Sequence, residues 1–328
     1  MTETTHQGLT NQRDSIQLRH FDVDRDLPGL VQLQTIIEEA DQTGEDVSEE
    51  TLKAQLHLPG HDPAQDGWVA TIAHEQEQII GFGTVWKVPQ NAHADIYVGV
   101  HPAWRRQGIG GKLLQHILQR AQALSSQHIL AYANIRHQDA LAFLHKRAFA
   151  PVASYTLMRL AAEKQVPQAE WPAGYTIRQY RPEADFPLLL DMYNRAFQGL
   201  WGHWEHVTAE ALHGILEQEN PAGIFLLITQ SGEVVGTCRG EMSEHLSTKR
   251  GKETGYLDAP GIVPAHRSTK LYLSQLLYAA HWVRTQASQT PIDIELESWG
   301  DDPQVLSEYQ QAGFEKVEQQ VIHRWSGQ

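Results

Sequence analysis

Residues 96–112 read Ile-Tyr-Val-Gly-Val-His-Pro-Ala-Trp-Arg-Arg-Gln-Gly-Ile-Gly-Gly-Lys, the most distinctive stretch of this 328-residue chain. A β-branched run ends at Pro102, a basic pair follows, and three glycines open a stretch in which apolar residues recur at helical spacing. Glycines let backbone N–H groups approach an anion closely, and the N-terminus of a helix favours negative charge. We therefore predict a pyrophosphate site at residues 105–112, the glycine loop.

The spacing of the glycines excludes two common phosphate-binding loops. A dinucleotide fingerprint counted from Gly108 requires glycine at the position of Leu113. A P-loop requires glycine at the position of Arg106 and a hydroxyl residue after Lys112, where Leu113 stands again. Neither class of nucleotide-binding protein fits the sequence.

Regular elements on both sides of the glycine loop indicate an α+β fold. β-Branched and aromatic runs predict strands, and apolar residues three and four apart predict helices. The expected elements are strands at 68–72 and 79–86 joined by a turn at 74–78, a strand at 96–100, a helix at 109–121, a strand at 128–133 and a helix at 140–146. This order predicts a mixed, mostly antiparallel sheet flanked by helices.

The chain repeats its own pattern. Leu18-Arg19-His20-Phe21, followed by Asp26, matches Ile177-Arg178-Gln179-Tyr180, followed by Asp185. Further matches in the same order are Ile79-Ile80-Gly81 with Val234-Val235-Gly236, Val100-x-Pro102-x-x-Arg105 with Ile262-x-Pro264-x-x-Arg267, and Ala148-Phe149 with Gly313-Phe314. Such self-similarity indicates one domain duplicated. We expect domains at 14–160 and 175–328, joined by a proline-containing linker at 161–174.

With Arg105-x-x-Gly108-x-Gly110 behind a Val-x-Pro strand end, the first copy resembles the GNAT superfamily of N-acyltransferases, and the repeat resembles its tandem type. The resemblance implies two tandem acyl-CoA N-acyltransferase folds and acetyl-CoA as co-substrate. It also implies that a splayed strand pairs with the pantetheine arm and that loop amides bind the pyrophosphate. The cofactor-binding residues so implied are Val98, Gly99, Val100, Arg105, Arg106, Gln107, Gly108, Ile109, Gly110, Gly111, Lys112 and His137.

The catalytic positions of the family are incompletely filled in the first copy. The resemblance implies direct attack of an amine on the thioester, often helped by a glutamate base and a tyrosine acid. Ile96 stands at the glutamate position and Leu144 at the tyrosine position. Asp95, acting through a water, is the candidate base, and a solvated strand face is the alternative interpretation. For His137 the alternative is a surface histidine that begins a helix.

The second copy shows the opposite pattern. Asp258, Asp302 and Tyr309 stand at the base, asparagine and tyrosine positions of the family. The segment that matches the glycine loop, residues 267–272, nevertheless reads Arg-Ser-Thr-Lys-Leu-Tyr, with Lys270 and Tyr272 in place of both glycines. Side chains there would crowd an approaching pyrophosphate. We expect a degenerate domain that does not bind coenzyme A, although Lys270 could contact phosphate as a point charge.

Features of the second copy bear on the acceptor. Asp293, Glu295 and Glu297 share one strand face and would either receive a cation or remain solvated. Asn194-x-Ala196-Phe197 with Trp201-Gly202 resembles mycothiol synthase-like members of the superfamily. Those enzymes use the second-half loop that is degenerate here, so the resemblance does not carry their activity over. Trp201 and Trp204 predict either aromatic walls for an amine or interdomain packing.

Composition limits the remaining classes. A net charge of -14 argues against nucleic-acid binding, the single Cys238 excludes a disulfide framework, and 18 scattered histidines predict no metal site. No apolar run predicts a membrane span, and residues 1–13 lack a signal-peptide pattern, so we expect a cytoplasmic protein. The predicted function is transfer of an acetyl group from acetyl-CoA to a small-molecule amine, with the cofactor bound in the first domain. The alternative is a non-catalytic acetyl-CoA sensor or interaction protein.

Overall fold

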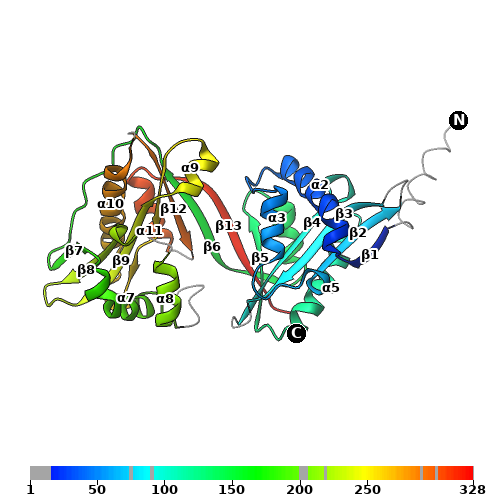
Figure 1. The fold of residues 1–328 in the computed structure, drawn as a ribbon, viewed down its shortest axis with the longest axis horizontal. Helices are drawn as coiled ribbons and strands as arrows, with labels where there is room; N and C mark the ends of the chain where they lie inside the picture. Colours follow the sequence, from blue (N-terminus) through cyan, green and yellow to red (C-terminus); the bar gives the residue numbers. More distant parts are fainter. Residues whose placement is uncertain are drawn as a thin grey trace. The chain divides into compact units, whose positions relative to one another are not determined.

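The computed structural model describes residues 16–73, 77–88, 92–198, 206–217, 220–288, 291–299 and 302–327. The chain forms two units (Figure 1). Unit 1 comprises Met1–Val152 and Val321–Gln328, and unit 2 comprises Ala153–Gln320.

The sheet of unit 1 follows the chain from β1 to β5. The strands are β1 (Ile16–His20), β2 (Gly67–Ala73), β3 (Glu77–Trp86), β4 (His93–Val100) and β5 (His128–Asn134). Neighbours pair antiparallel as far as β4, and β4 pairs with β5 in parallel. The sheet is therefore mixed and mostly antiparallel, as predicted.

Helices cover both faces of this sheet. They are α2 (Val23–Asp41), α3 (Glu49–Leu56), α4 (Pro63–Asp66), α5 (Ile109–Ala123), α6 (Gln138–His145) and the 3-10 turn η1 (Pro102–Trp104). The apolar stripe of α5 packs with Ala70 and Ile80, whereas α2 and α3 pack with Val69 and Phe82. Side chains alternate between the faces of a strand, so α5 lies on one face and α2 and α3 on the other.

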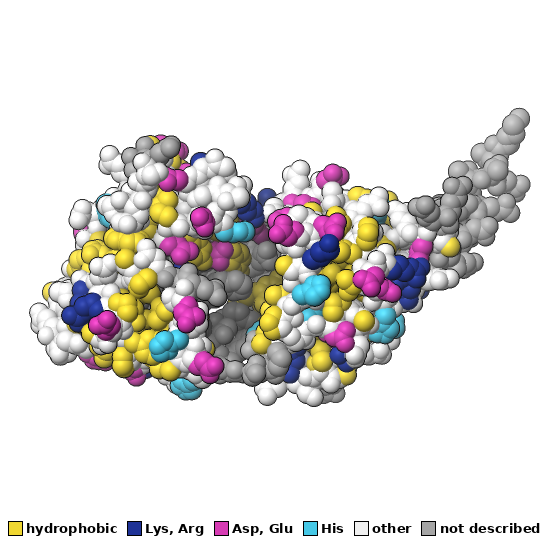
Figure 2. Space-filling model, viewed as in Figure 1, with side chains coloured by type: hydrophobic (Ala, Val, Ile, Leu, Met, Phe, Trp, Pro, Cys, Tyr) yellow, Lys and Arg dark blue, Asp and Glu magenta, His cyan; other side chains and the backbone are white. Residues whose placement is uncertain are grey.

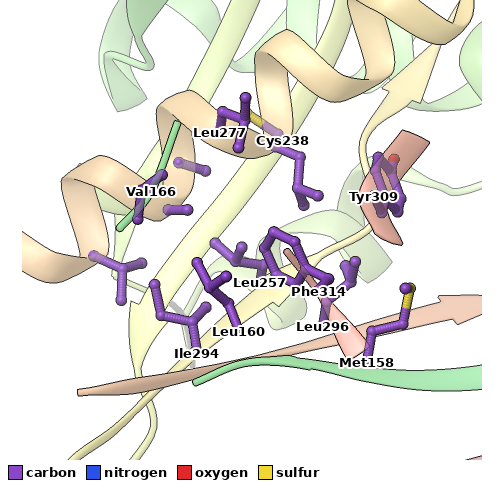
Figure 3. Packing of buried hydrophobic residues seen from close by; sticks show 14 of the residues in the cluster. Met158, Leu160, Val166, Cys238, Leu257, Leu277, Ile294, Leu296, Tyr309 and Phe314 are labelled. Carbon is purple, nitrogen blue, oxygen red and sulfur yellow. The ribbon is translucent and has the colours of Figure 1, made fainter. Parts of the chain in front are cut away.

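Unit 2 repeats this plan. Its strands are β7 (Tyr175–Gln179), β8 (Ile224–Thr229), β9 (Val234–Met242), β10 (Thr254–Asp258), β11 (Gly261–Ile262) and β12 (Asp293–Trp299). Its helices are α7 (Pro182–Ala196), α8 (Ala209–Leu216), α9 (Glu244–Arg250), α10 (Thr269–Gln286) and α11 (Pro303–Gln311), with turns η2 (Pro221–Gly223) and η3 (Pro264–His266). Figure 3 shows the core between α10 and the sheet, where Leu257 and Leu296 lie close to Phe314 and Tyr309.

A buried ion pair recurs at the same place in both units. Arg19 donates to both carboxylate oxygens of Asp26 at 2.6 and 2.7 Å, and Arg178 does so to Asp185 at 2.5 and 2.8 Å. Each carboxylate also caps its helix by accepting a backbone N–H four residues earlier. These residues are the ones whose repetition predicted the duplication, and the shared geometry explains why they recur.

Two strands run through both units. β13 (Glu315–Trp325) lies between β5 and β6 (Phe149–Leu160), and β6 lies between β13 and β12. The start of β6 and the end of β13 therefore belong to unit 1, and the rest of both strands belongs to unit 2. The structural units thus differ from the expected domains 14–160 and 175–328, because strand pairing returns the last residues of the chain to the first unit. The linker at 161–174 stays a prediction about where the two repeats join.

The charge pattern agrees with the composition. Asp and Glu side chains are scattered over the visible face of each unit, with Lys and Arg interspersed (Figure 2). Within the described ranges, no helix combines the length and the apolar character needed to cross a bilayer, and no cluster of ligating side chains is suited to a metal ion. Cys238 is buried, which raises the pKa of its thiol.

Candidate functional site

The sheet of unit 1 opens between β4 and β5. Their parallel pairing ends at Ile96 and Ala131, although β4 continues to Val100 and remains paired with β3. The last residues of β4, including the predicted Val98 and Gly99, therefore face the opening with an edge that β5 does not occupy. Such an edge can pair with an extended amide-containing ligand.

The glycine loop presents unpaired backbone donors at the end of this opening. Gly108 is the N-cap of α5 in the left-handed region (φ 86°), and no side chain caps the helix. Among the described residues, none of the backbone N–H groups of residues 106–111 has a hydrogen-bond acceptor. Together with the helix dipole, these donors form an anion site of the kind that binds phosphate.

Positive charge and close packing surround these donors. Arg106 and Lys112 are exposed beside the loop. A Cβ added to Gly111 would lie 2.9 Å from the Arg147 guanidinium, and one added to Gly110 would lie 3.3 Å from the Phe143 ring. The backbone of both glycines is thus approached closely, and Arg147 adds a cation that the sequence did not single out.

Arg105 joins the glycine loop to the end of β4 and to the end of α2. Its Nε donates to the carbonyl oxygen of Val100, and its two terminal nitrogens each donate to Asp41, at the end of α2, at 2.7 Å. The hydrogen bonds to Asp41 raise the pKa of Arg105. Its charge is therefore partly neutralised, and its main role in unit 1 is to hold the loop against the strand end.

The matching segment in unit 2 has the same arginine contact, but fewer of its backbone donors are free. Arg267 donates from Nε to the carbonyl oxygen of Ile262, as Arg105 does to Val100. Helix α10, however, begins at Thr269 with Ser268 as its N-cap, and the Ser268 side chain accepts from the Leu271 N–H. The Tyr272 N–H donates to the Ser268 carbonyl oxygen. Leu271 and Tyr272 match Ile109 and Gly110, so these two donors, which are free in unit 1, are satisfied within unit 2.

The predicted base and His137 lie on the α2 side of unit 1. Asp95 accepts a hydrogen bond from the Tyr132 hydroxyl at 3.1 Å and lies 3.8 Å from His93. Burial raises the pKa of Asp95. The Nε2 atom of His137 lies 2.9 Å from the carbonyl oxygen of Asp41 and is occupied there.

The register between the two copies differs from the one expected. Gly81 pairs with Val100, and Gly236 pairs with Ile262, so these positions correspond as predicted. One extra residue lies between the β10 and β11 pairings with β9. Leu257 pairs with Gly240, which lies four residues after Gly236, just as Ile96 pairs with Val85, four residues after Gly81. Leu257 therefore corresponds to Ile96, and Asp258 corresponds to Tyr97. The expected match of Asp258 with Ile96 is wrong by one position.

The candidate catalytic and acceptor residues of unit 2 are held by their own neighbours. Tyr309 is fully buried in the core, 6.5 Å between ring centroids from Phe314. Asp258 pairs with Arg239, and Asp302 caps α11. The three strand carboxylates are also paired: Asp293 with Lys252, Glu295 with Arg159 and Arg250, and Glu297 with the Tyr256 hydroxyl. They are therefore a bonded network rather than a bare solvated face.

The segment that resembled mycothiol synthase-like proteins is only partly described. Trp201, Gly202 and Trp204 lie outside the described residues. Asn194 accepts from the Val207 N–H and donates to the Val207 carbonyl oxygen, so it joins α7 to the chain beyond that segment. Its place in the pattern has a structural explanation.

A mixed sheet that opens after its fourth strand, next to an uncapped glycine loop, fits the acetyl-CoA-dependent acyltransferase predicted from the sequence. Residues 31–149 match the acetyltransferase (GNAT) family model. The chain is 26% identical to a mycothiol acetyltransferase of Kytococcus sedentarius over 83% of this chain and 84% of that protein.

Solved structures share the whole two-unit fold. A GCN5-related N-acetyltransferase from Sphaerobacter thermophilus has a TM-score of 0.68 at 21% identity, over 94% of this chain and 95% of that one. A tandem GNAT protein from the clavulanic acid biosynthesis pathway has a TM-score of 0.59 at 15% identity, over 94% and 98%. Residues 31–149 thus match the GNAT acetyltransferase model, and the chain shares the fold of these solved structures.

Proposed function

We propose that the chain transfers the acetyl group of acetyl-CoA to the amine of a small molecule by direct attack, with acetyl-CoA bound in unit 1 alone. The observation that carries the proposal is the contrast between the starts of α5 and α10. The N–H groups at the start of α5 have no protein acceptor, whereas Ser268 accepts from Leu271 and Tyr272, which match Ile109 and Gly110.

The residues of unit 1 fit such a co-substrate. The N–H groups from Arg106 to Gly111 would bind the pyrophosphate, supported by Lys112 and Arg147. The free edge of Val98, Gly99 and Val100 would pair with the pantetheine amides. His137, already bonded to the end of α2, would line the same opening.

The chemistry required of the protein is modest. Positioning the amine against the thioester supplies much of the rate, and a base must remove the proton that the amine loses. Leu144, at the position of the family's tyrosine, is buried in the core and donates no proton. The thiol is acidic enough to leave without that help, at some loss of rate.

The acceptor is proposed as a small amine because the curated relatives are named mycothiol acetyltransferases. The network at Asp293, Glu295 and Glu297 is internally paired, so it gives no support to an acceptor site in unit 2. We infer that unit 2 has a structural role, because β6 and β13 run through both units.

The test is acceptor-dependent thiol release by the full chain. Acetyl-CoA is incubated with amino sugars, amino acids and polyamines in turn, and free thiol is followed with time. We expect release that requires one class of amine and disappears in Gly110→Glu. Binding of acetyl-CoA without release by any amine would instead favour the sensor.

A further inference from the structure

A tyrosine and a carboxylate meet where β4 and β5 separate. Asp95 pairs with Leu130 across the two strands, and Tyr132 is the next residue of β5 on the same face. Tyr97 lies on this face as well, and its hydroxyl donates to Gln34 of α2. Tyr132 and Asp95 therefore lie at the mouth of the opening, on the side of the sheet that α2 covers.

The hydrogen bond between them has a defined direction. The Tyr132 hydroxyl lies 3.1 Å from Asp95 Oδ1, and the residue is 37% exposed. Burial, followed by the negative charge of Asp95, raises the pKa of Tyr132. The tyrosine therefore stays protonated and donates a hydrogen bond to the carboxylate, and its oxygen can still accept a hydrogen bond from another group.

Other titratable groups near Asp95 come from the same two strands. His93 of β4 lies 3.8 Å from Asp95 Oδ2, and His128 pairs with His93 across the strands. Lys87, at the end of β3, donates to the carbonyl oxygen of Leu124 instead. Among the described residues, His93 is the only ion-pair partner of Asp95.

We propose that Tyr132 is the group that takes the proton from the acceptor amine, and that Asp95 is the positioning residue that receives the tyrosine proton. The proposal rests on the proposed function. As the amine nitrogen forms its bond to the acetyl carbon, the carbon–sulfur bond breaks and its electron pair stays on sulfur. The proton of the nitrogen passes to Tyr132 Oη while the Tyr132 proton passes to Asp95 Oδ1. Tyr132 replaces the water through which Asp95 was expected to act.

Unit 2 contains a matched control. Tyr256 corresponds to Asp95 and Glu297 to Tyr132, and the Tyr256 hydroxyl donates to Glu297 at 3.3 Å. The same pair of groups bridges the same two strand positions, with the partners exchanged. Because coenzyme A is proposed to bind in unit 1 alone, the pair in unit 2 should only hold the strands together. Tyr256→Phe therefore measures the structural part of such a bond.

The experiment compares Tyr132→Phe, Asp95→Asn, their double mutant and Tyr256→Phe in the full chain. The amine that gives the fastest thiol release from acetyl-CoA is the probe, and kcat, KM for the amine and coenzyme A affinity are measured. We expect Tyr132→Phe and Asp95→Asn to lower kcat at least tenfold with KM and affinity within threefold. The double mutant should be no slower than the slower single mutant, because the two residues act as one relay. Tyr256→Phe should keep kcat within threefold.

Two results would overturn the inference. One is a Tyr132→Phe variant that keeps kcat within threefold of an active parent, which leaves the proposed function intact. The other is an equal loss in Tyr132→Phe and Tyr256→Phe, which would assign both bonds to structure. A parent chain that releases thiol with no amine would instead refute the proposed function on which the relay rests.

Discussion

The starts of α5 and α10 share one plan and differ in what satisfies their backbone. In both units an arginine braces the turn against the strand end, Arg105 to Val100 and Arg267 to Ile262. In unit 2, Ser268 then caps the helix and accepts from the N–H groups of Leu271 and Tyr272. In unit 1, the N-cap is Gly108, which has no side chain to accept a hydrogen bond, and the N–H groups of Ile109 and Gly110 stay free. Capping within the chain thus removes backbone donors that could otherwise bind a ligand.

If the two units share a frame, damage to shared features should be equal in both. Asp26→Asn and Asp185→Asn each remove the charge of a buried carboxylate and leave its partly exposed arginine without a counter-charge. We expect each to lower the free energy of unfolding by about 2–3 kcal/mol, measured by chemical denaturation at pH 7. If only one of the two variants lost stability, the ion pair would not have the same structural role in both units.

The same carboxylates predict a pH dependence. Burial raises the pKa of Asp26, but the hydrogen bonds from Arg19 and from the backbone outweigh it and hold the pKa below its ordinary value. The hydrogen bond from Arg178 lowers the pKa of Asp185 further. A depressed pKa stabilises the fold above the unfolded value, about 3.9, and the stabilisation is lost as the pH falls below it. Each Asn variant should therefore lose less stability between pH 5 and pH 2 than the parent chain.

Features that differ between the units should respond unequally. Gly110→Glu places a carboxylate among the free N–H groups of unit 1, and we expect it to weaken coenzyme A binding at least tenfold, about 1.4 kcal/mol. Tyr272→Glu is the matched change in unit 2 and should leave affinity within twofold. Gly110 is preferable to Gly108, whose positive φ would strain any side chain. Calorimetry measures both variants, and a ligand-free melting curve close to that of the parent shows that Gly110→Glu remains folded.

The smallest effect on the acetylation rate is expected at Tyr309, which stands at the tyrosine position of the family. Tyr309 is fully buried in the core of unit 2, among apolar side chains that include Phe314 and Leu296 (Figure 3). We expect Tyr309→Phe to keep the acetylation rate within about threefold, less than about 0.7 kcal/mol of barrier. A hundredfold loss at unchanged stability would mean that unit 2 takes part in the chemistry.

Local pattern predicted much of this arrangement. The strand ending at Pro102, the glycine loop and the apolar stripe of α5 are all encoded by residues within a few positions of one another. The predicted strand at 96–100 begins earlier, at His93, and the predicted helix at 109–121 extends to Ala123. The repeated Arg–Asp motif was also visible, because both partners lie within a single strand-to-helix turn.

The missed features depend on distant contacts. Asp41 meets Arg105 across 64 positions, and Arg147 reaches Gly111 from the end of α6. Neither has a spacing signal, since only the folded sheet brings those elements together. The return of the last residues to unit 1 was hidden for the same reason. The extra residue between β10 and β11 also made the expected match of Asp258 wrong by one position, because sequence spacing alone does not show which residues pair.

The most direct test of a single co-substrate site in unit 1 is the stoichiometry of coenzyme A binding to the intact chain, measured by titration calorimetry. We expect one molecule per chain, because the N–H groups of Ile109 and Gly110 are free in unit 1, whereas those of Leu271 and Tyr272 at the matching positions have acceptors within unit 2. The same titration of Gly110→Glu should show no comparable site, and that of Tyr272→Glu should again show one. A stoichiometry near two, or one site that survives Gly110→Glu, would contradict the assignment of the co-substrate to unit 1.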